Sequence, residues 1–254
     1  MSIGKYIDKM GIEIEAGWKR KRTDLIEDVS IKKEAFSVSK SIGEFVSQPF
    51  KNKEGLFQSL KENWGDETTE RCSFHLHLSF KNLMFYSQCM SFSFYSFFLE
   101  EMEKWGKNYP CRNELFWQRL KGDNKYCTRS FHPETQIIGK VKKHNDENRY
   151  THLNYCYGVY ETIECRLFPT FCDVDTAISA TKALINCVEV YLEKNPFKEV
   201  IIDELIDNVD EDSCDELKLI PFNLFKIDKN VVPKANKWPN YYLPKIEFIE
   251  DKSF

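Results

Sequence analysis

The chain has 254 residues, of which 42% are hydrophobic and 15% aromatic, so it is long and apolar enough to bury a core and is not a disordered chain. Its 36 basic and 40 acidic residues are well mixed and give a net charge of −4. This balance disfavours nucleic acid as a partner, because proteins that bind duplexes usually carry a basic excess or a basic face. The length suits one domain, and we expect a single domain over residues 1–254.

Cysteine usage indicates a reducing compartment. The nine cysteines are scattered and include no Cys-x-x-Cys pair, so zinc-ribbon spacing is absent. Residues 1–10 lack the apolar core of a signal peptide. We therefore expect free thiols and a cytoplasmic protein.

One segment, residues 83–99, has no charge over 17 positions, which is the short limit for a helix that spans a membrane. It also contains four serines and a glutamine and runs directly into a charged stretch. We therefore expect a buried helix of a soluble domain and no contact with a membrane.

The first third of the chain is predicted to form mainly strands. Strands are expected at residues 6–18, 26–31, 34–41 and 41–49, the last one ended by a proline. A helix is expected at residues 53–63, where apolar side chains recur at helical spacing before a glycine.

The rest of the chain mixes strands and helices. Strict alternation predicts a strand at residues 71–80, and two further strands are expected to form a hairpin at residues 149–157 and 160–168. Helices are expected at residues 82–106, 114–120 and 175–194, the last one capped by Asp173 and stopped by Pro196.

This order of elements has no regular βαβ rhythm, so it predicts an α+β fold with a mostly antiparallel sheet. We expect the core to comprise about residues 8–195. Residues 196–254 are acidic at first and then rich in proline, and we expect an acidic helix followed by an extended tail.

Three of the predicted strands carry pairs of ionisable residues on one face and apolar residues on the other. The pairs are Glu13 with Glu15, His75 with His77, and Glu164 with Arg166. A fourth strand adds Glu44. Each pair alone is typical of a solvated face, but together they predict a shared site.

The chemistry of such a site follows from its residue types. Carboxylates that lie together repel one another unless a cation neutralises them. Oxygen ligands with one imidazole suit Mg²⁺ or Mn²⁺ better than zinc. Arg166 adds a planar cation suited to phosphate. Acids, an imidazole and an arginine on one face are what phosphoryl transfer requires.

The order of five short motifs resembles the amidoligase family, which is similar to the carboxylate–amine ligases typified by glutamine synthetase and glutamate–cysteine ligase. The motifs are Gly11-Ile-Glu-Ile-Glu15, Gly43-Glu-Phe-Val-Ser47, Cys72-Ser-Phe-His-Leu-His77, residues 149–154 and Thr162-Ile-Glu-Cys-Arg-Leu-Phe168. The resemblance covers roughly residues 8–190 and depends on the number and order of the motifs. The family often has glycine directly before the His-x-His strand, where this chain has Ser73.

The resemblance implies a curved, mainly antiparallel sheet, like the catalytic domain of glutamine synthetase, with helices on its outer face. It implies that the concave face binds ATP and two or more Mg²⁺ or Mn²⁺ ions. The reaction would activate a carboxylate as an acyl phosphate, which an amine attacks to give an amide, ADP and phosphate. The implied partners are ATP and an amino-acid, peptide or protein substrate.

The resemblance also implies a role for each matching residue. The metal ligands would be Glu13, Glu15, Glu44, His77 and Glu164. The contacts to nucleotide or phosphate would be His75, Arg129, Arg149, Asn154 and Arg166. Catalysis would depend on Glu44, Glu164 and Arg166. Either histidine of the pair could be the one that binds metal, and Asp28 and Ser30 resemble an Asp-x-Ser element of the family.

Two other functions stay open at this point. A metal-dependent hydrolase or a cupin-like oxygenase would use His75, His77 and one glutamate to bind a single Zn²⁺ or Fe²⁺. A non-catalytic descendant of the ligase fold would bind nucleotide or a protein partner without turnover. Metal analysis separates the first of these from the ligase, and ATP cleavage with added acids and amines separates the second.

Overall fold

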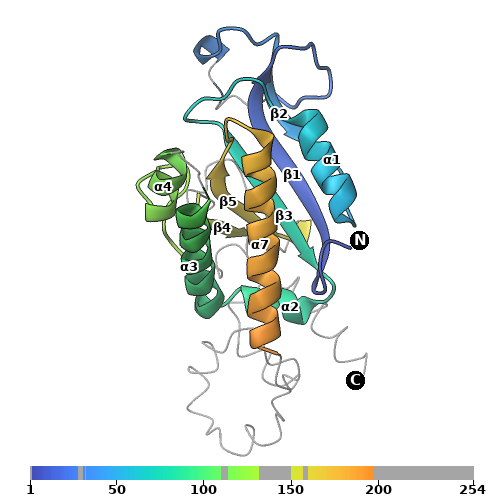
Figure 1. Cartoon of the computed structure of the whole chain (residues 1–254), viewed down its shortest axis with the longest axis vertical. Coiled ribbons are helices and arrows are strands. Elements are labelled where there is room, and N and C mark those ends of the chain that lie inside the picture. Colours follow the sequence, from blue (N-terminus) through green and yellow to red (C-terminus); the bar gives the residue numbers. More distant parts are fainter. Residues whose placement is uncertain are drawn as a thin grey trace, which may run out of the picture.

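A five-stranded antiparallel sheet forms the centre of the computed structural model, with the strand order β2-β1-β3-β5-β4 (Figure 1). The structure describes residues 2–27, 31, 33–109, 114–131, 150–156 and 160–196. The strands are β1 (Ile7–Trp18), β2 (Ser41–Val46), β3 (Ser73–Phe80), β4 (Leu153–Tyr155) and β5 (Ile163–Pro169). The predicted α+β class with a mostly antiparallel sheet is confirmed.

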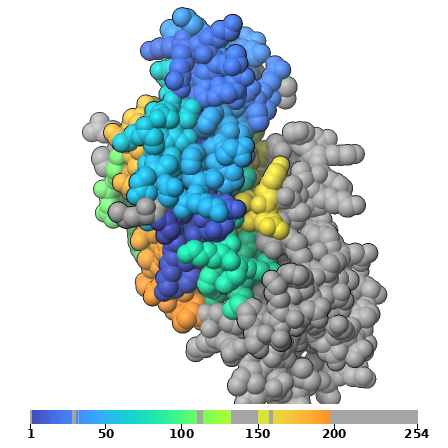
Figure 2. Space-filling model, turned by 90° about the vertical axis from the view of Figure 1, so that its right-hand side faces the viewer, coloured from blue at the N-terminus to red at the C-terminus, as the bar shows by residue number. Residues whose placement is uncertain are grey.

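Five helices of the described residues pack against this sheet: α1 (Lys53–Asn63), α2 (Leu83–Cys89), α3 (Phe92–Asn108), α4 (Glu114–Lys121) and α7 (Val174–Lys194). Helix α7 lies across the middle of one face, between α1 and α3 (Figure 1). In the side view, the segment between β1 and β2 (blue) forms one end of the molecule, next to α1 (Figure 2).

Alternation along β1 divides the sheet into two faces. Ile12 and Ile14 are 1% and 0% exposed and belong to the core beneath the helices. Glu13 and Glu15 point to the opposite face, because successive residues of a strand alternate. The acidic side chains are therefore on the face that α7 does not cover.

Helix α7 begins where the sequence predicts. Asp173 Oδ1 accepts a hydrogen bond from the Thr176 backbone N–H at 2.7 Å, and Asp173 Oδ2 accepts from the Thr176 hydroxyl at 2.8 Å. The helix then buries Ala177, Leu184 and Val188 against the sheet. The long amphipathic helix and its N-cap are confirmed.

Strand β5 contains a β-bulge. In its pairing with β3, Phe74 lies opposite Phe168, whereas Leu76 lies opposite Cys165, so β5 has one residue more than β3 over this interval. Phe168 and Cys165 can both face the core, although three positions separate them, because of this extra residue. The bulge lies opposite His75.

Several predicted elements differ from the structure. The single helix expected over residues 82–106 is two helices, because the Ser91 hydroxyl accepts a hydrogen bond from Phe94 N and starts α3 anew. The strand expected at residues 34–41 is wrong: a 3₁₀ turn, Lys33–Ala35, is followed by bends. Of the strand expected at residues 26–31, Ile26 forms a single bridge to Glu44, and residues 28–30 lie outside the described residues.

The other strand and helix predictions are close to the structure. The hairpin is confirmed as β4 and β5, although β4 is shorter than expected. None of the helices in the described ranges is long and apolar enough to span a membrane. The expected acidic helix and tail at residues 196–254 lie outside the described residues, apart from Pro196 itself.

Candidate metal centre

Strand register brings the predicted residues together. Glu13 lies directly opposite His75 in the pairing of β1 with β3. His77 lies opposite Glu164 in the pairing of β3 with β5. Glu44 on β2 lies opposite Glu15 on β1. Residues that are far apart in the sequence thus meet on one face of the sheet.

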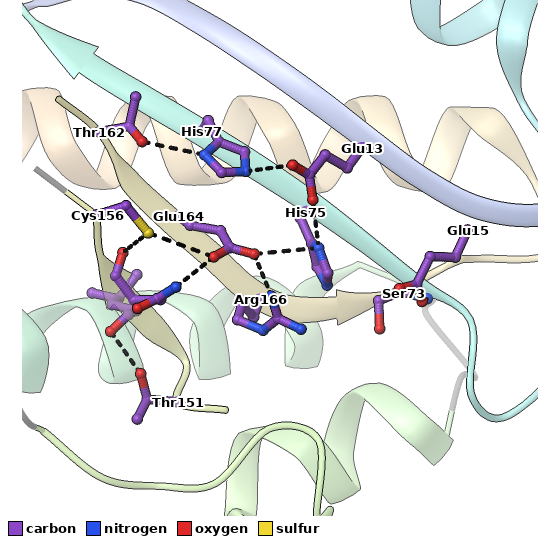
Figure 3. Close-up of polar contacts among 12 residues, drawn as sticks. Glu13, Glu15, Ser73, His75, His77, Thr151, Cys156, Thr162, Glu164 and Arg166 are labelled. Carbon is purple, nitrogen blue, oxygen red and sulfur yellow. Dashed lines mark hydrogen bonds and ion pairs between the residues drawn. The ribbon is translucent and has the colours of Figure 1, made fainter. Parts of the chain in front are cut away.

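The Glu13 carboxylate lies between the two imidazoles. Its Oε2 is 3.0 Å from His75 Nδ1, and its Oε1 is 3.0 Å from His77 Nε2. His75 Nδ1 is also 3.3 Å from Glu164 Oε1. Figure 3 shows these side chains pointing toward one another from β1, β3 and β5. The His75 side chain is 3% exposed, whereas those of His77 and Glu13 are 14% and 23% exposed, so the cluster is only partly shielded from solvent.

A second set of contacts fixes Glu164. Its Oε1 accepts a short hydrogen bond from Arg166 Nη1 (Figure 3). Its Oε2 accepts a hydrogen bond from Asn154 Nδ2 at 2.6 Å. The Cys156 thiol donates to the same Oε2 at 3.8 Å. The guanidinium of Arg166 also lies over the Tyr150 ring, 5.6 Å from its centroid. Glu164 is therefore held in one orientation.

The electrostatics keep the acids ionised. Burial raises the pKa of the Glu13 carboxyl, but hydrogen bonds from His75 and His77 lower it more, and the net pKa lies well below its usual range. Burial likewise raises the pKa of Glu164, whereas the charges of Arg166, His75 and His77 lower it, and the net pKa is lowered. Carboxylates must be ionised to bind a metal ion, so both are ready to act as ligands.

The pKa values of His77 and Arg166 are shifted upward, in the opposite direction to those of the two carboxyl groups. Burial lowers the pKa of His77, but its hydrogen bond to Glu13 and the charge of Glu164 outweigh this, and the net pKa is raised. Burial lowers the pKa of Arg166 too, and the neighbouring Glu164, Glu15 and Glu13 carboxylates raise it overall. The cluster is thus an assembly of anions balanced by nearby cations.

Two groups of ligand atoms could each hold a metal ion. One comprises Glu13, His77 and Glu164, and the other comprises Glu13, Glu44 and His75; within each group the ligand atoms lie within 4.8 Å of one another. His75 Nε2 is buried and has no hydrogen-bond partner within the described residues, so this imidazole has an unused nitrogen. These donors fit a divalent cation. Glu13 belongs to both groups, so two ions would share it.

Other residues from the sequence analysis lie elsewhere. Glu15 Oε2 accepts a hydrogen bond from the Ser73 backbone N–H at 2.6 Å, and Glu15 is in neither group. Arg129 is exposed beside Gly122, and no contact between described residues joins it to the cluster. Arg149, Asp28 and Ser30 lie outside the described residues. For all of these, the predicted roles stay predictions.

The sequence analysis missed two residues of the site. Thr162 Oγ1 forms a hydrogen bond with His77 Nδ1 at 3.2 Å, and Cys156 contacts Glu164. The alternation of β5 contained the signal for Thr162, because Thr162 shares a face with Glu164. No such pattern marks Cys156, because the strand before it, β4, has only three residues and is too short to show alternation.

The comparisons with known proteins give no relative: no family model matches the chain, and no curated protein and no solved structure is similar to it. The resemblance to amidoligases therefore stays a prediction. It depends on the number and order of the motifs.

Proposed function

We propose that this chain is an ATP- and divalent-metal-dependent carboxylate–amine ligase that forms an amide or peptide bond through an acyl phosphate. The observation that carries the proposal is the pair of carboxylate–imidazole groups that share Glu13, with Arg166 bound to Glu164 beside them. The curved sheet of glutamine synthetase and the amidoligase family are part of this proposal, and the five-stranded antiparallel sheet is compatible with both.

The ligand sets favour hard cations over zinc or iron. Each group contains two carboxylates and one imidazole, which suits Mg²⁺ or Mn²⁺. In the described part of the chain, no group contains both histidines, as a site of two histidines and one carboxylate would require. This observation argues against the hydrolase and oxygenase alternatives.

When bound, the cations would neutralise the charge that develops on the phosphates of ATP. Glu13, Glu44, His75, His77 and Glu164 would hold them. Arg166 would orient the γ-phosphate, because a guanidinium presents several N–H donors in a fixed plane. Its Nε is buried and has no hydrogen-bond partner within the described residues, so one donor is still to be satisfied.

The proposed reaction has two steps. An oxygen of the substrate carboxylate attacks the γ-phosphorus of ATP, and the bond from that phosphorus to the bridging oxygen breaks and releases ADP. The amine nitrogen then attacks the acyl carbon, the bond to the phosphate oxygen breaks, and the amine loses a proton. The oxygen of Glu44 that does not hold a cation would receive this proton, since Glu44 is only half-buried and a carboxylate within hydrogen-bond reach of the amine is a suitable base.

The test is a screen for phosphate release from ATP with paired amino acids and small peptides, in the presence of Mg²⁺. Glu164→Gln is the blank, and Glu103→Gln, the same change at an exposed position of α3, is the matched control. We expect release that requires both an acid and an amine, reduced about 100-fold or more in Glu164→Gln. Equal release by wild type and Glu164→Gln for every pair would refute the ligase.

Metal analysis of the purified protein separates the remaining alternatives. One tightly held zinc or iron ion per chain would favour a hydrolase or an oxygenase. Binding of ATP and Mn²⁺ without cleavage for any pair of substrates would favour a non-catalytic descendant of the ligase fold.

A further inference from the structure

Arg119 on α4 is a fully buried cation that contacts the ends of two site-bearing strands. Its Nη1 donates to the Phe168 carbonyl at 3.0 Å and to the Arg166 carbonyl at 3.4 Å. Its Nη2 donates to the Ser73 hydroxyl at 3.0 Å and to the Cys72 carbonyl at 3.4 Å. One guanidinium thus joins the beginning of β3 to the end of β5.

The contacts of Arg119 coincide with the bulge of β5. A bulge disrupts the regular ladder and leaves backbone groups to be satisfied in another way. Arg119 supplies donors to the carbonyls of Arg166 and Phe168, which flank the extra residue. Glu164 lies before this bulge, in regular pairing with His77, and Arg166 lies within it. The conformation of the bulge therefore determines where Arg166 points, and Arg166 in turn donates a hydrogen bond to Glu164.

His152 forms hydrogen bonds with both Arg119 and the bulge of β5. Its Nε2–H donates to the Arg119 carbonyl at 2.6 Å, and its own carbonyl accepts from the Arg166 backbone N–H at 2.9 Å. The Tyr95 hydroxyl donates to His152 Nδ1 at 2.9 Å. The bulge is therefore held by the guanidinium of Arg119 and by the backbone carbonyl of His152, and the imidazole of His152 is itself fixed.

A buried charge is a poor means of stabilising a fold. Removing a guanidinium from water is costly, and apolar packing in its place is often neutral or stabilising. Within the described residues, no carboxylate lies at ion-pair distance from Arg119, since the polar contacts of its guanidinium are to carbonyls and a hydroxyl. The guanidinium of Arg119 is planar and can donate to several oxygens at once, which suits a position surrounded by three carbonyls and a hydroxyl.

We propose that Arg119 is a positioning residue of the metal centre: it locks the bulge of β5 and so fixes Glu164 in the group formed by Glu13, His77 and Glu164. The second group, with Glu44 and His75, is carried by β1, β2 and β3. The bonds of Arg119 to this part of the site are at Cys72 and Ser73, where β3 begins, so we expect a smaller effect on this group. The inference rests on the metal site of the proposed function.

The test measures Mn²⁺ binding by equilibrium dialysis and electron paramagnetic resonance for Arg119→Met, in the wild-type background and in the Glu164→Gln background. We expect two Mn²⁺ ions in wild type and about 10-fold weaker binding of one of them in Arg119→Met, as for other residues that orient metal ligands. In the Glu164→Gln background, Arg119→Met should cause no further weakening, because the residue through which it acts is gone.

Two further variants keep the test decisive. Thr181→Val removes a buried hydroxyl from α7 whose hydrogen bond is to the Ala177 carbonyl of its own helix, and it should lower stability without changing Mn²⁺ binding. If Arg119→Met does not fold, Ser73→Ala takes its place, since it removes one acceptor of Arg119 and keeps the N–H that binds Glu15. Ser73→Ala should weaken the binding of one Mn²⁺ ion about threefold, and only in the wild-type background.

The outcomes distinguish this inference from the proposed function. Unchanged or tighter Mn²⁺ binding in Arg119→Met, or equal weakening in both backgrounds, would overturn the positioning role and leave the metal centre intact. Failure of wild type itself to bind Mn²⁺ would overturn the metal centre and the positioning role together.

Discussion

His152 should make the stability of this protein depend on pH between about 6.5 and 4. Its imidazole is 0% exposed, donates from Nε2 to the Arg119 carbonyl and accepts at Nδ1 from the Tyr95 hydroxyl. Both nitrogens are thus used by the neutral ring. Burial lowers the pKa of His152 to about 4, against an ordinary value of 6.5, although the hydrogen bond to Arg119 acts in the other direction.

The sign and size of the effect follow from linkage. Between pH 6.5 and 4 the unfolded chain binds a proton at His152 and the folded chain does not, so falling pH favours unfolding. The difference of about 2.5 pH units, at about 1.4 kcal/mol for each unit, corresponds to about 3 to 4 kcal/mol of unfolding free energy in total. This contribution is fully present above pH 6.5 and is lost by about pH 4.

The assay is urea unfolding at several pH values for wild type and His152→Gln. The glutamine amide can still donate to the Arg119 carbonyl but does not titrate. The other titrating groups, Glu13 and Glu164 among them, are common to both proteins and cancel in the difference. Wild type should lose about 3 kcal/mol more than the variant between pH 7 and pH 4. Parallel curves for the two proteins would show that His152 is not held neutral.

Three further predictions concern the site and the fold. Glu13→Gln should weaken the binding of both Mn²⁺ ions about 100-fold or more, because Glu13 is in both ligand groups and even residues that only orient ligands contribute about 10- to 100-fold to metal affinity. Isothermal titration calorimetry measures both affinities, and one unchanged affinity would contradict the prediction. Tyr95→Phe should lower the unfolding free energy at pH 7 by about 1–3 kcal/mol, since it leaves His152 Nδ1 without its donor; an unchanged urea midpoint would speak against the bond. Asp173→Ala should cost about 1 kcal/mol in thermal unfolding, because it removes the N-cap of α7, and Asp175→Asn, which removes a charge from the same turn without uncapping it, should cost less.

The faces of the strands could be predicted from the sequence, because alternation is a local property. Period-two patterning alone puts Glu13 with Glu15, His75 with His77 and Glu164 with Arg166 on shared faces. Alternation says nothing about which strands are neighbours. That Glu13 meets His75, and that His77 meets Glu164, depends on strand order and register, which are set by packing between distant segments.

The failures of the sequence analysis have local causes. Ser91 is the N-cap of α3, but it lies within a run of aromatic and other apolar residues, so the sequence analysis predicted one helix where α2 and α3 are separate. Arg119 lies between Phe116 and Leu120 on the buried stripe of α4. An arginine at that spacing was a sign of a buried polar contact, but its acceptors are carbonyls of β3 and β5, and no pattern of side chains predicts those.

The bulge in β5 connects these local and distant contributions. A regular strand would have kept Glu164 and Arg166 on one face, as alternation predicts, but would have turned Phe168 away from the core. The extra residue lets Phe168 pack in the core while Arg166 stays bound to Glu164. This arrangement disturbs the ladder opposite His75, and Arg119 and His152 supply the hydrogen bonds that the disturbed backbone needs. The buried polar contacts of Arg119 and His152 and the geometry of the candidate site therefore have the same origin: both follow from placing Arg166 and Phe168 where β5 departs from regular geometry.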